Sequence, residues 1–273
     1  MPELPEVETA RALVADHALG RRIVEVDDRD TYVCRPHRPG EIREALIGRR
    51  LTSAHRRGKT MWCDTSGRRG AKTPGPELGL HLGMAGRLIV SDGTADGAEV
   101  YGGGPGRRHK IIKPEWDRFT LRFDDGGSLR LFDTRRLSRV RLDPDISALG
   151  PDGLEIGLAE FRERVGRGTI AVKARLLDQS TVAGIGNLLA DQLLWEAYVS
   201  PKHRCDELTP DQLTALHKAT KHALKLATKK GGVHTGEFIE HRRPGGTCPR
   251  CGTAVVHATV GSRSTWWCPQ EQI

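Results

Sequence analysis

The sequence predicts an α+β protein: a first half of short antiparallel strands, arranged as a β-sandwich or barrel, and a second half that is mainly helical. Short alternating apolar runs dominate the chain up to residue 132, helical periods follow from residue 158, and clustered cysteines come last. A chain of 273 residues exceeds what one small core needs, so we expect two domains or more.

The first half is expected to open with a helix, from about Pro5 to roughly Leu19, because proline suits the first helical turn and carboxylates are favoured there. Alternating runs bounded by turn residues then predict strands at Arg22–Val26, Lys59–Cys63, Gly86–Val90, Arg118–Phe123 and Ser128–Phe132. Asp124–Gly127 is a hairpin signal between the last two. Residues 67–76 and 92–114, rich in Gly, Arg and Pro, are predicted to be loops.

The second half begins after an expected linker at residues 142–153, where Asp, Pro and Gly are concentrated. Helical periods then predict four helices, at Leu158–Val165, Ile170–Asp178, Asn187–Ala197 and Pro210–Lys230. A short tail with metal-ligand spacing is expected to follow them.

Composition and charge narrow the class of protein. Hydrophobic residues make up 37% and charged residues 29%, as in ordinary globular proteins. Lys and Arg number 43 against 35 Asp and Glu, a formal +8, which favours a polyanionic partner, nucleic acid first. A generally basic protein without such a partner is the alternative. No apolar run approaches ~18 residues and no signal peptide is evident, so we expect a cytoplasmic protein that does not enter membranes.

The first eight residues carry the most specific chemistry. Removal of Met1 would leave Pro2 with a secondary amine, a kind of group that starts near pKa ~8 and is partly neutral at pH 7. Such an amine can attack a carbonyl-like carbon and form an iminium, while Glu3 or Glu6 moves protons. The alternative is an ordinary frayed terminus, in which proline and glutamate only favour solubility.

Two further stretches can hold phosphates. His55–Lys59 is predicted to be a basic turn at the start of a strand, which can grip phosphates through side chains and backbone N–H groups, or is simply a solvated turn. Gly184 and Gly186 precede a predicted helix, so its N-terminus can take a phosphate, with Asn187 at the cap position. An ordinary junction between two helices explains the glycines equally well.

The cysteines divide into two groups. Cys34, Cys63 and Cys205 are scattered and are expected to be inert thiols. The other group is a pair of Cys-x-x-Cys-like knuckles with a hairpin-length spacer, which predicts one zinc ion per chain. Its expected ligands are Cys248, Cys251, Cys268 and Glu271, with His257 as a possible substitute for the carboxylate.

With these stretches in view, the chain resembles the formamidopyrimidine-DNA glycosylase / endonuclease VIII family of DNA repair enzymes. The similar stretches occur in the family's order: Pro2–Glu8, Arg57–Lys59, His81–Gly86, Asp133–Leu137, Ala183–Asn187 and the cysteine segment. The resemblance implies a two-layered β-sandwich with flanking helices, a helix–two-turn–helix domain and a zinc-finger-like β-hairpin. We therefore expect a catalytic domain at 1–141, the linker at 142–153, the helix–two-turn–helix domain at 154–245 and the hairpin at 246–273.

The resemblance also implies catalytic roles. Pro2 would attack C1′ of the damaged nucleotide, Glu3 would be the acid that assists ring opening, and Glu6 would support them. Lys59 matches the lysine of the family's catalytic loop and would hold a phosphate next to the flipped nucleotide.

DNA contacts are expected from a further set of residues. Asn187 and Arg263 would hold flanking phosphates, and Lys173 matches a family lysine near the site. Residues that would fill the gap left by the flipped base are Met84, Arg135 and Leu137. Ordinary core packing is the alternative for Met84 and Leu137.

Departures from the family pattern leave the preferred base open. Leu137 stands where the enzymes for oxidised purines carry Phe, and Trp116 and Arg118 stand where they carry histidines. Residues 231–246 look too short for the loop that caps 8-oxoguanine in those enzymes, and Glu271 replaces a zinc cysteine.

The expected function is base-excision repair: removal of oxidised bases from double-stranded DNA and cleavage of the abasic site by β/δ-elimination, performed by a monomer. The alternative is a lesion-binding protein of the same fold without efficient glycosylase activity. Retention of Met1 would favour this alternative, because a blocked nitrogen cannot form the iminium. An RNA-binding protein fits the charge but gives no reason for the Pro2-Glu3 start.

Overall fold

The computed structural model describes residues 2–68, 73–94, 98–103 and 113–273, which form two compact units. Unit 1 contains Pro2 and Glu6–Ile146, and unit 2 contains Glu3–Pro5 and Ser147–Ile273.

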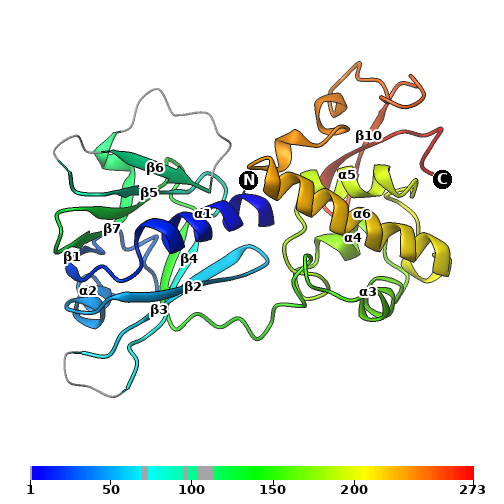
Figure 1. The fold of residues 1–273 in the computed structure, drawn as a ribbon. Helices are drawn as coiled ribbons and strands as arrows, with labels where there is room; N and C mark the ends of the chain where they lie inside the picture. The colour runs from blue at the N-terminus through cyan, green and yellow to red at the C-terminus, as the bar shows by residue number, and fades with distance from the viewer. Residues whose placement is uncertain (1, 69–72, 95–97, 104–112) are drawn as a thin grey trace. The chain divides into compact units, whose positions relative to one another are not determined.

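Unit 1 contains two antiparallel sheets (Figure 1). The five-stranded sheet has the order β1 (Ile23–Asp27), β7 (Asp117–Phe123), β8 (Ser128–Phe132), β5 (Arg87–Ser91) and β6 (Glu99–Gly102). The four-stranded sheet has the order β2 (Leu51–Arg57), β3 (Thr60–Thr65), β4 (Leu78–His81) and β9 (Arg139–Leu142).

The core of unit 1 is made by apolar side chains from both sheets and from helix α1 (Leu4–His17). Alternation along the strands decides which side chains enter it: in β3, Met61 and Cys63 are buried and their neighbours are partly exposed. The short helix α2 (Glu41–Leu46) and the one-turn η1 (Pro114–Trp116) complete the described part of this unit.

Unit 2 is helical. Its α-helices are α3 (Leu158–Val165), α4 (Val172–Leu177), α5 (Asn187–Glu196) and α6 (Pro210–Lys229). Short 3-10 turns lie at η2 (Cys205–Glu207), η3 (Val233–Thr235) and η4 (Ile239–His241), and the last element is the hairpin of β10 (Val256–Val260) and β11 (Arg263–Trp267). The longest helix, α6, begins at a capping box in which Thr209 and Gln212 satisfy each other's backbone N–H groups.

The predicted β-sandwich, helical region and C-terminal hairpin are confirmed, whereas five elements were not predicted: β2, α2, β4, β6 and β9. Strand β6 lies inside residues 92–114, which were expected to be loop, and residues 69–72, 95–97 and 104–112 of the two expected loops lie outside the described part. Within the described residues, no helix is both long and apolar enough to cross a membrane.

Candidate functional site

The carboxylate of Glu3 is held by the first turn of α5. It accepts hydrogen bonds from the backbone N–H groups of Gly186 at 2.9 Å, Leu188 at 2.8 Å and Leu189 at 3.1 Å. The N–H groups at a helix start have no partner within the helix and favour a negatively charged acceptor. Glu3 is 1% exposed, so its orientation is fixed by these three bonds.

The glycines before α5 make room for this N-terminal segment. A Cβ on Gly186 would lie 2.2 Å from Cδ of Glu3, and one on Gly184 would lie 2.5 Å from Cδ1 of Leu4. Gly184 also has a φ of +113°, and its carbonyl accepts the Leu4 N–H at 3.1 Å. The expectation of a phosphate at this helix start is therefore corrected: the protein's own Glu3 occupies the N–H groups.

Pro2 directly precedes this fixed glutamate, while Met1 lies outside the described residues. Glu6 is 2% exposed in the first turn of α1. The third carboxylate of the opening stretch, Glu8, binds the guanidinium groups of Arg11 at 2.7 Å and Arg56 at 2.8 Å. Glu8 is thus engaged in ion pairs that tie α1 to β2.

Lys59 lies in the tight turn between β2 and β3, after Gly58, whose φ is +59°. The prediction that His55–Lys59 forms a basic turn at the start of a strand was wrong in detail: His55 and Arg56 belong to the end of β2. Arg56 binds Glu8, and His55 contacts Asp64 at 2.9 Å, so the turn itself presents Lys59.

A single buried carboxylate shapes the loop that carries Arg135 and Leu137. Asp133, with no exposed surface, accepts the backbone N–H groups of Arg135, Leu137 and Ser138, each at 2.8 Å, and the Ser138 hydroxyl at 2.7 Å. Arg135 is exposed and Leu137 is half-buried. The sequence analysis missed the role of Asp133, although its place at the start of the loop is typical of a residue that caps a turn.

The loop bearing Met84 packs against this Asp133 loop. Gly83 has a φ of +58°, and a Cβ there would lie 2.4 Å from the backbone carbonyl of Leu137. The Ser138 hydroxyl also donates to the Leu82 carbonyl at 3.2 Å. Met84 is 42% exposed. The core-packing alternative is therefore incorrect for Met84, and the two loops present Met84 and Leu137 from adjacent positions.

His81 is a second residue that the sequence analysis did not single out. Its Nδ1 accepts the Gly83 N–H at 3.1 Å, which leaves Nε2 to carry the proton of the neutral ring. Burial, followed by the positive charges of Lys59, Arg139 and Arg141, holds the pKa of His81 below its usual value of 6.5. A cavity of about 270 Å³ adjoins it, lined by Thr60, Gly79, Leu80, His81, Arg139, Arg141, Pro144 and Asp145. Basic side chains from β4 and β9 therefore gather in unit 1 close to the predicted Lys59 turn.

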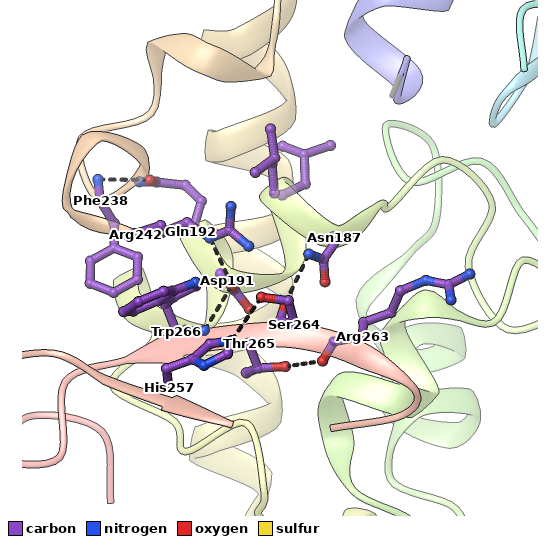
Figure 2. A network of polar contacts seen from close by, with 12 residues as sticks. Asn187, Asp191, Gln192, Phe238, Arg242, His257, Arg263, Ser264, Thr265 and Trp266 are labelled. Atoms are coloured by element: carbon purple, nitrogen blue, oxygen red, sulfur yellow. Dashed lines mark hydrogen bonds and ion pairs between the residues drawn. The ribbon is translucent and has the colours of Figure 1, made fainter. Parts of the chain in front are cut away.

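Unit 2 contributes Asn187 and Arg263. Asn187 is the first residue of α5, and its side-chain amide donates to the Ser264 carbonyl at 2.9 Å (Figure 2). Arg263 is exposed at the start of β11, directly after the two-residue turn of the hairpin. The side chain of Asn187 is therefore bound to the residue that follows Arg263, which brings the two predicted phosphate ligands of this unit close together.

Lys173 requires a correction. Its side chain has no exposed surface, and its Nζ contacts Asp191 Oδ1 at 2.6 Å, Thr265 Oγ1 at 2.7 Å and the Ser264 carbonyl at 3.2 Å. One ion pair and two hydrogen bonds therefore engage the ammonium group entirely within the protein. The prediction that Lys173 contacts DNA is therefore not supported; the lysine is a buried part of the protein interior.

Three cysteines form the predicted metal centre. The sulfur atoms of Cys248, Cys251 and Cys268 lie within 4.8 Å of one another, an arrangement positioned to bind zinc. The Trp195 indole N–H donates to Cys248 Sγ at 3.4 Å, a contact that helps to orient this sulfur atom.

Glu271 and His257 are not part of this cluster among the described residues. The Glu271 carboxylate lies 3.9 Å from the Arg250 guanidinium, which is itself sandwiched between the rings of Trp195 and Tyr198. His257 contacts the Ser264 hydroxyl at 2.9 Å and packs on the Trp266 ring. Three cysteine sulfur atoms are therefore in place, and the expected carboxylate ligand faces a cation instead.

Comparison with known proteins covers the whole chain. Three family models match consecutive parts of the chain. They are the formamidopyrimidine-DNA glycosylase N-terminal domain over residues 1–140, the formamidopyrimidine-DNA glycosylase H2TH domain over 149–238, and the zinc finger found in FPG and IleRS over 245–270. A formamidopyrimidine-DNA glycosylase of Stenotrophomonas maltophilia is 33% identical and covers 98% of both chains. One of Roseiflexus is 32% identical and covers 100% of both.

Solved structures share the fold. The Lactococcus lactis Fpg in complex with DNA containing an abasic site has a TM-score of 0.79, with 24% identity and 99% coverage of both chains. The same protein with DNA containing FAPY-dG gives the same TM-score. The order and extent of these matches agree with the two units and the hairpin described above.

Proposed function

Because the chain belongs to the formamidopyrimidine-DNA glycosylase family, we propose that it is a base-excision repair enzyme that removes oxidised bases from damaged double-stranded DNA and then cleaves the abasic site, with Pro2 as nucleophile. The observation that carries this proposal is the fixed position of Glu3, whose carboxylate is bound by three backbone N–H groups at the start of α5. A proton-transfer group must be held in place next to the reacting amine, and Glu3 is the residue directly after Pro2.

The chemistry follows from an amine at C1′. The nitrogen of Pro2 forms a bond to C1′, the bonds from C1′ to the base and to the sugar ring oxygen both break, and each departing atom takes up a proton. The amine loses its own proton, and the product is an iminium between Pro2 and C1′. Loss of a proton from C2′ then expels the 3′-phosphate by β-elimination, and a second elimination releases the 5′-phosphate. Glu3 supplies and removes these protons, and the nearby Glu6 supports it.

Phosphates are held by basic and amide groups of both units. Lys59 and His81 present N–H donors from unit 1, and Asn187 and Arg263 present them from unit 2. Contacts to phosphate fix the register of a duplex without reading its sequence. The net charge of +8 supports the same partner.

The wedge consists of Met84, Leu137 and Arg135. An exposed methionine beside a half-buried leucine can enter the space that a flipped nucleotide leaves in the stack, and a neighbouring guanidinium can meet the orphaned base. The close approach of Gly83 to Leu137 keeps the two loops together. The zinc that Cys248, Cys251 and Cys268 would hold stabilises the segment from which Arg263 projects.

Borohydride trapping tests the nucleophile. The protein, with its mass checked for loss of Met1, should become covalently attached to DNA containing an abasic site when the iminium is reduced. Pro2→Gly retains an amine and should trap more slowly. An N-terminal extension that places Pro2 inside a peptide bond should abolish trapping, while the same extension at the C-terminus should not. Undiminished trapping by the N-terminally extended protein would overturn the assignment of Pro2.

A further inference from the structure

A buried charge cluster links four separate segments of unit 2. Asp191 on α5 lies between two cations: Lys173 of α4 contacts its Oδ1 at 2.6 Å, and Arg242, which follows η4, contacts its Oδ2 at 2.8 Å. The backbone N–H of Trp266 on β11 also donates to Oδ2 at 3.1 Å (Figure 2). Lys173 and Asp191 have no exposed side-chain surface, so neither can reach a ligand.

From Lys173, a chain of hydrogen bonds runs to the backbone of Arg263. The ammonium group donates to the Thr265 hydroxyl at 2.7 Å, and that hydroxyl donates to the Arg263 carbonyl at 2.9 Å. Thr265 is completely buried, so water does not compete for these bonds. The backbone from which the Arg263 side chain projects is therefore fixed to α4.

The same lysine reaches Asn187. The Ser264 carbonyl accepts from Lys173 Nζ at 3.2 Å and from the Asn187 amide at 2.9 Å. One backbone oxygen thus joins the lysine, the start of α5 and the strand that carries Arg263.

The turn of the hairpin is also seated beside Lys173. Gly261 and Ser262 both have a positive φ, of 57° and 60°, as a tight two-residue hairpin turn requires. A Cβ on Gly261 would lie 2.8 Å from Cβ of Ala174, the residue after Lys173. This contact does not involve the charged groups, and it places the turn on α4 independently of them.

We propose that Lys173 is a positioning residue, which fixes Asn187 and Arg263 relative to each other so that they bind the DNA backbone as one unit, without itself touching DNA. The inference rests on the proposed function, because it takes Arg263 as a phosphate ligand. It predicts that loss of Lys173 removes the contribution of Arg263 to binding while Arg263 is still present.

A double-mutant cycle on Kd tests this coupling, with a duplex that contains a tetrahydrofuran abasic-site analogue. Arg263→Ala should weaken binding about tenfold and flatten the salt dependence of log K by roughly one unit of slope. Lys173→Met should do the same, and the double variant should bind no more weakly than about the worse single variant. Lys221→Met is the matched control, because the Lys221 ammonium bonds to the Leu154 carbonyl of the same unit and belongs to no part of this cluster.

Thr265→Val is a second variant that tests the coupling in case Lys173→Met fails to fold. It removes the hydroxyl between Lys173 and Arg263 and leaves the charges of Lys173 and Asp191 in place. The losses of binding free energy in Thr265→Val and Arg263→Ala should also be non-additive. A variant that loses thermal stability but keeps the wild-type salt slope would show a merely structural lysine and overturn the inference.

The outcomes separate the two proposals. A normal loss of affinity in Arg263→Ala, with losses in Lys173→Met and Thr265→Val that multiply with it, would overturn the positioning role alone. Wild-type affinity and slope in Arg263→Ala would overturn the phosphate role of Arg263 and, with it, the coupling.

Discussion

At the scale of single residues, buried carboxylates organise the candidate site. Glu3 accepts three backbone N–H groups at the start of α5, Asp133 accepts three in the wedge loop, and Asp191 accepts one from β11 while pairing with two cations. In each case a charged acceptor satisfies donors that would otherwise be buried without a partner. Of these, only Glu3 was predicted from the sequence, because its place after Pro2 is part of a recognisable stretch. Asp133 acts on groups two to five residues later in the chain, a local turn-capping pattern that was not recognised, whereas only the fold brings the partners of Asp191 near.

The His81 ring makes folding stability dependent on pH. Its pKa is lowered in the folded state by burial and by Lys59, Arg139 and Arg141, so below pH 6.5 the unfolded chain binds more protons at this residue than the folded one. The contribution of neutral His81 to folding stability is therefore fully present above pH 6.5 and is lost as the pH falls. We expect the free energy of unfolding of the wild type to decrease as the pH falls from 7 to 5. In His81→Asn, which can keep the hydrogen bond from the Gly83 N–H, this free energy should decrease less.

Urea unfolding at several pH values measures this difference. His17→Asn is the matched control, because His17 is an exposed histidine at the end of α1. Identical slopes for the wild type and His81→Asn would contradict the assignment.

At the scale of elements, sequence patterns predicted what is long or strictly alternating. The four helices of unit 2 and strands such as β7 and β8 lie within a few residues of their predicted ranges. Apart from the seven-residue β2, the missed elements are short and are defined by their neighbours: β4 and β9 have four residues each and pair with each other, and α2 has six. Four residues carry too little periodicity to identify a strand, and the pairing that stabilises β9 joins residues far apart in the chain.

The hairpin supports a prediction about zinc. Three cysteine sulfur atoms are in place and Glu271 faces Arg250, so Glu271→Ala should keep one zinc ion per chain, whereas Cys251→Ser should lose it. Glu271→Cys would supply a fourth soft ligand and should slow the loss of zinc to a chelator. Metal analysis and the rate of zinc release measure both effects, with far-ultraviolet circular dichroism as a check of the fold. Equal loss of zinc from Glu271→Ala and Cys251→Ser would establish Glu271 as a ligand.

At the scale of the whole molecule, the proposed function draws on residues of both units. Unit 1 contains Lys59, His81 and the wedge loops, and unit 2 contains the Glu3 cradle with Asn187 and Arg263. The family resemblance led to most of these residues, because each lies in a contiguous stretch. It failed for Lys173, whose sequence neighbourhood does not reveal that Asp191 and Thr265 enclose its ammonium group.

We expect the choice of lesion to depend on residues 231–246, and three contacts hold this segment against α5. The Phe238 N–H donates to Gln192 Oε1 at 2.9 Å, and the Phe238 ring stacks on Trp195 at 5.6 Å between centroids. The Arg242 guanidinium forms an ion pair with Asp191. A segment held at these points has little length left to close over a flipped base.

We therefore expect abasic-site cleavage to be faster than excision of 8-oxoguanine paired with cytosine. Reading a flipped base needs partners for its edge, and the fastened segment offers few. Leu137 is also smaller than Phe and stacks less well on the orphaned base, so discrimination of the opposite base should be weak. Ring-opened purines or oxidised pyrimidines should be released faster than 8-oxoguanine. Single-turnover rates on four duplexes that differ only in the lesion measure this order.

Leu137→Phe should improve discrimination of the opposite base without changing the rate at the abasic site, because the wedge does not touch the reacting carbon. If 8-oxoguanine opposite cytosine is released fastest by the wild type, the fastened segment does not limit the pocket and the argument from its length is wrong.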